Sequence, residues 1–143
     1  MEMKMVKELL LQSLEHEMGG VNIYATALKC AVNEELKEEW EKYHEETQKH
    51  VQILQDVCVQ MQLDPQEQTP GRKITHDKGE ALVASMEAAL GTGDKEAAQC
   101  VACEAVTVAE LIDMVYDGKG GWNDALPTEG KGGWVRTEGK GGW

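Results

Sequence analysis

Apolar residues recur every three or four positions through most of the first 117 residues, which is the spacing of one face of an α-helix. The residues between them are rich in Glu, Lys and Gln, which are good helix formers. The pattern predicts four helices, over residues 2–31, 33–62, 76–91 and 95–117. We therefore expect an all-α protein, an antiparallel four-helix bundle over residues 1–117, followed by a separate tail.

The links between these helices are also visible in the sequence. Asn33 is a suitable N-cap for the second helix. The link of residues 63–75 holds Pro65, Pro70 and Gly71, and it is long enough to cross the bundle. The turn at residues 91–94 is short, so the last two helices should form an antiparallel hairpin.

The charge is unevenly distributed. The net charge is −12, and residues 118–143 hold four basic and three acidic side chains, a net +1, so residues 1–117 carry −13. A surface this acidic repels nucleic acids and anionic lipids, and it attracts cations. No segment is apolar enough to span a bilayer or to act as a signal peptide. The four cysteines lie in helical segments, which predicts reduced thiols and a cytoplasmic location.

Three ionisable residues interrupt the apolar stripes at positions expected to face inward: Glu17, His50 and Glu104. Glu17 and His50 lie almost equally far from the first turn, so they should sit at the same height in their hairpin. Glu80 and Glu104 are equally far from the turn near residue 92. Two interpretations remain open: a metal site built from carboxylates and imidazole on facing helices, or a buried hydrogen-bonded Glu–His–Glu network.

Two segments carry a resemblance to a known family. The segment His16-Glu17-x-Gly-Gly-Val-x-x-Tyr24 and the segment Glu45-Glu46-Thr47-x-x-His50 resemble the ferritin-like superfamily, in particular its short bacterial, rubrerythrin-like members. The resemblance covers about residues 5–116. It implies a ferritin-like bundle that holds a di-iron or di-manganese centre and that oxidises Fe(II) or activates oxygen or peroxide. Iron is the expected metal, and zinc is an alternative that the donor types allow. The alternatives for this chain are a mononuclear, a rearranged or a lost site. Glu17, His50 and Glu104 match the family's metal ligands, and Glu80 matches loosely. Glu46, one turn before His50, is the next candidate ligand. Two ligand positions of the family pattern are instead Thr47 and Thr107.

The tail contains the motif acid-Gly-Lys-Gly-Gly-Trp three times, ending at Trp122, Trp134 and Trp143. A short aromatic motif repeated on a Gly-rich chain is typical of multivalent docking. We expect it to bind a protein shell, a scaffold or neighbouring copies; the resemblance to ferritin-like cargo proteins makes a shell available as a partner. The alternatives are a low-complexity tail, or a metal-free assembly module in which the repeats are the working part. A bundle this short should also gain stability as a homo-oligomer.

Cys100 and Cys103 lie one turn apart inside the last predicted helix. A regular helix places such a pair poorly for a disulfide. They are interpreted as small packing residues, with a soft-metal or redox role as the alternative.

Overall fold

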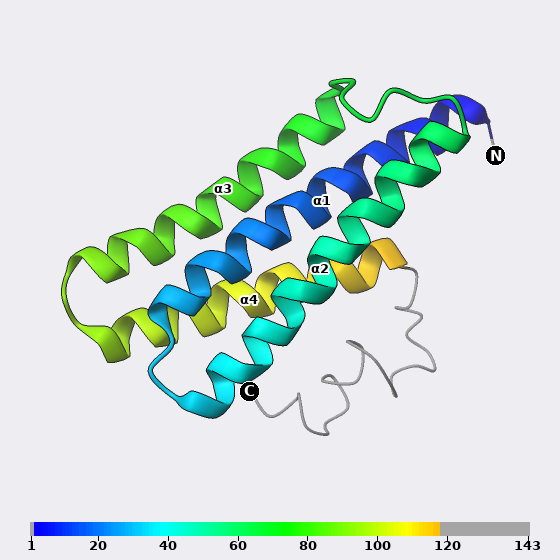
Figure 1. Cartoon of the computed structure of the whole chain (residues 1–143). Helices are drawn as coiled ribbons and strands as arrows, with labels where there is room; N and C mark the ends of the chain where they lie inside the picture. Colours follow the sequence, from blue (N-terminus) through cyan, green and yellow to red (C-terminus); the bar gives the residue numbers. More distant parts are fainter. Residues whose placement is uncertain (1, 118–143) are drawn as a thin grey trace. The chain divides into compact units, whose positions relative to one another are not determined.

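The computed structural model describes residues 2–117, and in that range the chain forms four helices and no strand (Figure 1). The helices are α1 (Met3–Cys30), α2 (Glu34–Gln60), α3 (Pro70–Gly91) and α4 (Lys95–Asp117). The all-α prediction is confirmed. The described helices divide into two units, with the boundary between Ala105 and Val106 in α4. The tail repeats lie outside the described residues.

The predicted helix ends are confirmed to within two residues, except at the start of α3. This helix begins at Pro70, six residues before the predicted position 76. The Thr69 hydroxyl accepts a hydrogen bond from the backbone N–H of Arg72 (3.1 Å), and Pro70 occupies the first helical turn. Proline is well tolerated there because the first N–H groups of a helix have no partner within it. Its interpretation as part of a link was therefore wrong.

Helix α1 lies between α2 and α3 and packs against both (Figure 1). Helices α1 and α2 are antiparallel. Contacts between α1 and α3 instead advance in the same direction along both helices, and they pair Glu8 with Thr69, Glu15 with Arg72, and Gly19 with Gly79. Helix α3 is therefore parallel to α1. The link between α2 and α3 joins them at the end of the helices where α2 finishes and α1 begins. The link passes from α2 over α1 to α3 at this end of the helices and does not run along their length (Figure 1).

The end of α2 sets this return. The N–H of Leu63 donates to the carbonyl of Cys58 (2.8 Å), and the N–H of Gln62 donates to that of Val59 (2.9 Å). This pair of bonds is the Schellman pattern that closes many helices. Gln62 has a φ of +62°, in the left-handed region that favours glycine. The chain can then turn back toward the first half of α1.

The best-defined core cluster joins α1 to the last turns of α2. Leu11, Leu14 and Cys58 are fully buried at its centre. Partly buried apolar side chains surround them: Leu10, Met18, Val51, Leu54 and Leu63. The first half of α4 buries a row of small residues, Ala98, Ala102 and Ala105. The side chain of Gln99 on this helix accepts hydrogen bonds from the backbone N–H groups of Val32 and Asn33, at 2.6 and 2.7 Å.

Candidate functional site

Glu17 on α1 and His50 on α2 face each other across the first helical hairpin. Their atoms Oε1 and Nδ1 are 3.3 Å apart. The Glu17 side chain is 13% exposed and that of His50 is 42% exposed. The prediction that these two residues lie at the same height is confirmed. The result is a largely enclosed carboxylate against an imidazole that solutes can reach.

The separation of these two atoms is also one that a metal ion allows. With metal–ligand bonds of about 2.1 Å, adjacent donors on one ion lie about 3.0 Å apart in octahedral geometry and about 3.4 Å apart in tetrahedral geometry. The observed 3.3 Å falls between these values. An ion can therefore take the place of the shared proton with little movement of either helix.

The residues beside His50 on α2 differ in what they can add. Glu46 is half-buried and lies one turn before His50 on the same side of the helix, so rotation of its side chain can bring a carboxylate to the pair. Thr47 is buried and packs closely: a Cβ built on Gly20 would lie 3.2 Å from its methyl carbon. Its hydroxyl donates to the carbonyl of Tyr43 (2.7 Å). Thr47 thus fills a family ligand position as a packing residue.

Glu80 and Glu104 do not point into the interior. The Glu80 side chain is 70% exposed, and its Oε2 lies 3.2 Å from Nε2 of His76 one turn earlier on α3. Glu104 is exposed because α4 buries its alanine row one residue out of phase with the predicted stripe. The predicted inward orientation of Glu104 is wrong, and Glu80 does not join it in an interior layer. Among the residues that the structure describes, no group of three or more His, Cys, Asp or Glu side chains is arranged to hold a metal ion.

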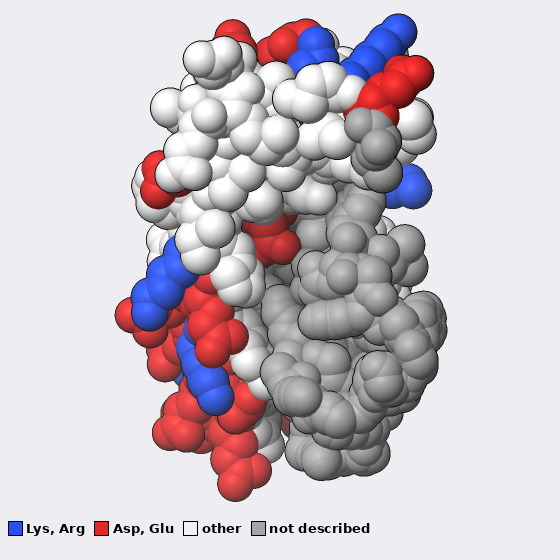
Figure 2. Space-filling model, turned by 90° about the vertical axis from the view of Figure 1, so that its right-hand side faces the viewer, with Lys and Arg blue, Asp and Glu red and all other residues white. Residues whose placement is uncertain are grey.

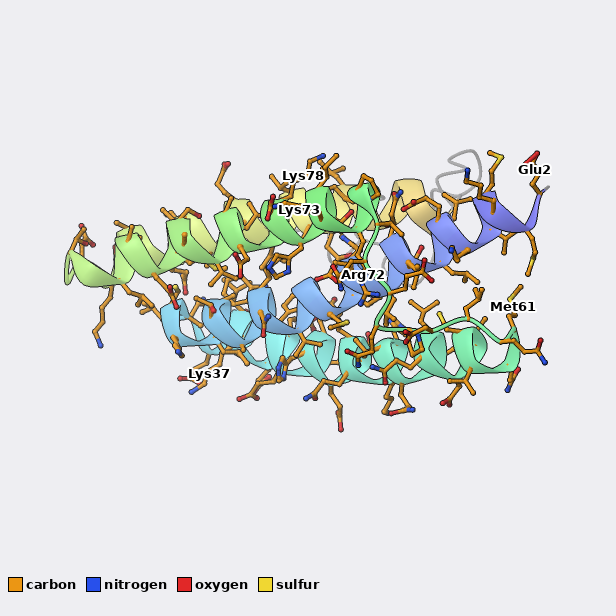
Figure 3. The ribbon with its side chains drawn as sticks, turned by 90° about the horizontal axis from the view of Figure 1, so that it is seen from above. Glu2, Lys37, Met61, Arg72, Lys73 and Lys78 are labelled. Carbon is orange, nitrogen blue, oxygen red and sulfur yellow. The ribbon has the colours of Figure 1, made fainter. Side chains whose placement is uncertain are left out.

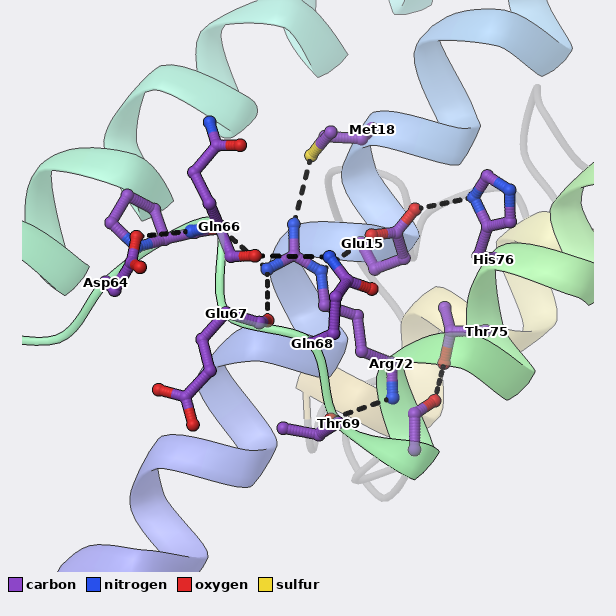
Figure 4. A network of polar contacts seen from close by, with 12 residues as sticks. Glu15, Met18, Asp64, Gln66, Glu67, Gln68, Thr69, Arg72, Thr75 and His76 are labelled. Atoms are coloured by element: carbon purple, nitrogen blue, oxygen red, sulfur yellow. Dashed lines mark hydrogen bonds and ion pairs between the residues drawn. The ribbon is translucent and has the colours of Figure 1, made fainter.

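A second polar cluster lies between α1 and α3, and it was not predicted from the sequence (Figure 4). Its centre is Arg72, which is only 3% exposed. Its Nε donates to Oε1 of Glu15 (2.7 Å), and its Nη1 donates to the carbonyls of Pro65 (2.6 Å) and Glu67 (3.0 Å). In Figure 3, Arg72 points between the helices while Lys73 and Lys78 point outward. One guanidinium therefore ties α1, α3 and the preceding link together.

His76 completes this cluster on its exposed side. Its Nδ1 lies 3.0 Å from Oε2 of Glu15. The hydrogen bond to Glu15 raises the pKa of His76 above its ordinary value of 6.5, and the nearby carboxylates of Glu80 and Asp77 act in the same direction, while partial desolvation opposes them. The sequence signal for this cluster was Arg72 itself, the one arginine among residues 1–117, but it fell in a segment predicted to be a link.

The link is fastened to the first turns of α1 as well. The Lys7 ammonium donates to Glu67 (2.8 Å). The Glu8 carboxylate accepts hydrogen bonds from Gln12 (3.0 Å) and Thr69 (2.7 Å), and these two bonds lower the pKa of Glu8. The contacts made by Arg72, Lys7 and Glu8 are those of a structural clamp. They leave the Glu17–His50 pair as the better candidate for a functional site.

The surface charge favours cations. Figure 2 shows acidic side chains gathered at the lower end of the face in view, with a few basic ones among them. The upper part of this face is mostly uncharged, with acidic and basic side chains along its upper edge. The first half of α2 contributes exposed glutamates at positions 34, 35, 38, 39, 41 and 45. Such a field raises the local concentration of positive ions.

A comparison with protein-family models gave no match, and comparisons with curated proteins and with solved structures gave none either. Over the described part of the chain, no helix has the length and apolar character that crossing a membrane requires.

Proposed function

We propose that this chain binds a divalent metal ion, with iron as the first candidate, between Glu17 and His50. The observation that supports the proposal is the 3.3 Å separation of a largely enclosed carboxylate oxygen and an imidazole nitrogen on facing helices. Oxygen and nitrogen donors together suit iron, manganese and zinc. Glu46 is the proposed third ligand, and water completes the coordination.

The donor set fits a single ion better than a di-iron centre. A ferritin-like di-iron site needs carboxylates from all four helices and two Glu-x-x-His motifs. Here Glu80 and Glu104 are exposed, and Thr47 occupies one of the ligand positions. The return of the chain after α2 also lacks the long crossover of ferritin-like folds. We therefore propose metal binding by a helical protein, and the ferritin-like classification remains a prediction.

Bound iron would supply one-electron chemistry toward oxygen or peroxide. The chain's own contribution is to hold the ion. The carboxylate of Glu17 is shielded from competing water, and the imidazole of His50 is open to the solvent from which the ion and an oxidant arrive. Oxidation of Fe(II) is the activity we propose for the loaded protein.

The test is anaerobic loading with Fe(II), desalting and elemental mass spectrometry of the full chain. We expect about one iron per chain in the wild type and its loss in E17Q/H50Q, whose amides keep the size of the side chains they replace. The matched control is H76Q/E80Q, which removes a Glu–His pair at a similar distance, 3.2 Å, in a more exposed place on α3. It also removes the contact of His76 with Glu15. Iron that is lost in H76Q/E80Q and kept in E17Q/H50Q would place the site on α3 and overturn the proposal.

A second candidate function is metal-free association through the tail repeats. It is favoured by the three Trp motifs and by exposed apolar side chains on the described helices, among them Met3, Met5, Leu9, Ile53, Val59 and Ile74. Deletion of residues 118–143 separates the two functions. If iron loading survives the deletion while sedimentation shows that self-association is lost, the two functions are independent. If the wild type bound no iron, association through the tail repeats would be the one remaining candidate function.

A further inference from the structure

The first half of α4 carries two thiols that the Glu17–His50 pair does not use. Cys100 is exposed and Cys103 is half-buried, and neither forms a disulfide. They lie one turn apart, so they share one side of the helix. Cys30 and Cys58, by contrast, are buried. Cys100 and Cys103 are therefore the thiols of the described chain that a dissolved ion can reach.

The geometry of a regular helix decides what this pair can bind. Residues three apart have Cβ atoms about 5–6 Å apart, whereas a disulfide needs about 3.5–4.5 Å. A two-coordinate ion with metal–sulfur bonds of about 2.3 Å holds its two sulfur atoms about 4.6 Å apart. Rotation about χ1 of the two cysteines reaches that separation without disturbing α4. The spacing that excludes a disulfide thus suits a linear S–metal–S unit.

We propose that Cys100 and Cys103 chelate one Cu(I) ion. Thiolates select soft ions, and Cu(I) accepts two sulfur ligands, whereas zinc in structural sites takes four. On binding, both S–H bonds break, two Cu–S bonds form and both protons go to solvent. The copper stays monovalent, so no oxidant or reductant is consumed.

The surroundings of the pair favour a cation. Glu96 lies one turn before Cys100 and Glu104 one turn after it, and both carboxylates are exposed. Burial raises the pKa of the Cys103 thiol, and the neighbouring Cys100 and Glu104 raise it further. Copper must therefore displace protons at neutral pH. Because a thiol must lose its proton to bind copper, the conditional affinity should rise with pH.

The experiment titrates the full chain, reduced and anaerobic, with Cu(I) supplied as a coloured chelator complex. Transfer of copper is followed by the loss of colour, and stoichiometry is read from native mass spectrometry. We expect one copper per chain for the wild type, retained against excess glutathione, and none for C100S/C103S. The E17Q/H50Q variant should bind copper normally, because this site is independent of the proposed iron site.

A matched control keeps the number of thiols and changes their spacing, at the cost of one carboxylate. In C100A/E96C the two thiols are seven residues, or about 10 Å, apart along the helix and cannot share one ion. We expect its copper affinity to fall at least about 100-fold through loss of chelation. E96Q removes the same carboxylate, leaves both native thiols in place and should bind like the wild type. Equal affinity for the wild type and C100A/E96C, or one copper per two chains, would overturn the proposal, provided circular dichroism shows that the variants are folded.

Discussion

Arg72 and Glu15 hold opposite charges where almost no water reaches either side chain. A buried charge without a partner costs several kcal/mol. Arg72 supplies the opposite charge that Glu15 needs, and it also donates hydrogen bonds to the carbonyls of Pro65 and Glu67. Only the forked guanidinium can serve both purposes in fixed directions, so lysine would not replace it.

Replacing Arg72 by methionine should therefore be strongly destabilising. R72M keeps most of the buried volume but leaves the Glu15 carboxylate with His76 alone. We expect the free energy of unfolding to fall by about 3 kcal/mol, measured by urea denaturation at neutral pH. K73M is the control, since Lys73 is exposed and pairs with Asp77 one turn away. It should change stability by less than about 0.5 kcal/mol, and equal losses in the two variants would contradict this account of Arg72.

These residues also show what periodicity can and cannot predict. Glu17 and His50 were found because each lies on the apolar stripe of its helix and their distances from the turn match. Glu15 was missed because α1 lies between two helices and buries two flanks, whereas a single stripe describes only one. Glu104 was misplaced because α4 buries alanines, whose small size gives a weak hydrophobic signal.

At the scale of the helices, the turn that closes α2 contains a residue in an unfavourable backbone conformation. Gln62 adopts a φ of +62°, which for a residue with a Cβ costs about 1–2 kcal/mol relative to glycine. Its side chain is exposed. Part of the stability of this turn is thus lost in forcing the backbone into a left-handed conformation.

Q62G should stabilise the protein. Glycine removes the strain but adds freedom to the unfolded chain, so we expect a net gain of about 0.5–1 kcal/mol in the free energy of unfolding. The control is Q60G, two residues earlier and inside the last turn of α2, where the backbone is right-handed. There glycine should lose about 0.5–1 kcal/mol. In the same denaturation assay, the two variants should change the free energy of unfolding in opposite directions. A loss of stability in both would argue against the left-handed turn.

Helix existence followed from the sequence because four long periodic segments leave little alternative. The start of α3 did not, because Pro70 can end a structure or open a helix, and only the cap formed by Thr69 distinguishes the two. The direction of α3 was also out of reach. The link between α2 and α3 returns beside α1 because Lys7, Glu8 and Glu15 hold it there, and those are contacts between distant parts of the chain.

For the whole molecule, charge sets how stability depends on pH. Residues 1–117 carry −13, so mutual repulsion of carboxylates weakens the folded state when all of them are ionised. The pKa of His76 is raised on folding, so its contribution is complete below its unfolded value of about 6.5 and is lost as pH rises through the folded value. The pKa of Glu8 is lowered, so its contribution is present above about 4.5 and is lost as pH falls through the folded value.

The contributions of His76 and Glu8 together predict maximal stability on the acidic side of neutrality, between about pH 4.5 and 6.5. Urea midpoints measured from about pH 4 to 9 should peak there and decline toward alkaline pH. H76Q should flatten the decline of the urea midpoint above about pH 6.5, because the glutamine does not titrate. E8Q should flatten only the decline of the midpoint below about pH 4.5. Added salt should raise the midpoint most at alkaline pH, where repulsion is greatest, and screening leaves the packed contacts of Leu11 and Leu14 unchanged. If H76Q and the wild type gave the same pH profile, the His76–Glu15 contact would contribute nothing to stability, and repulsion among carboxylates alone would have to explain the alkaline decline.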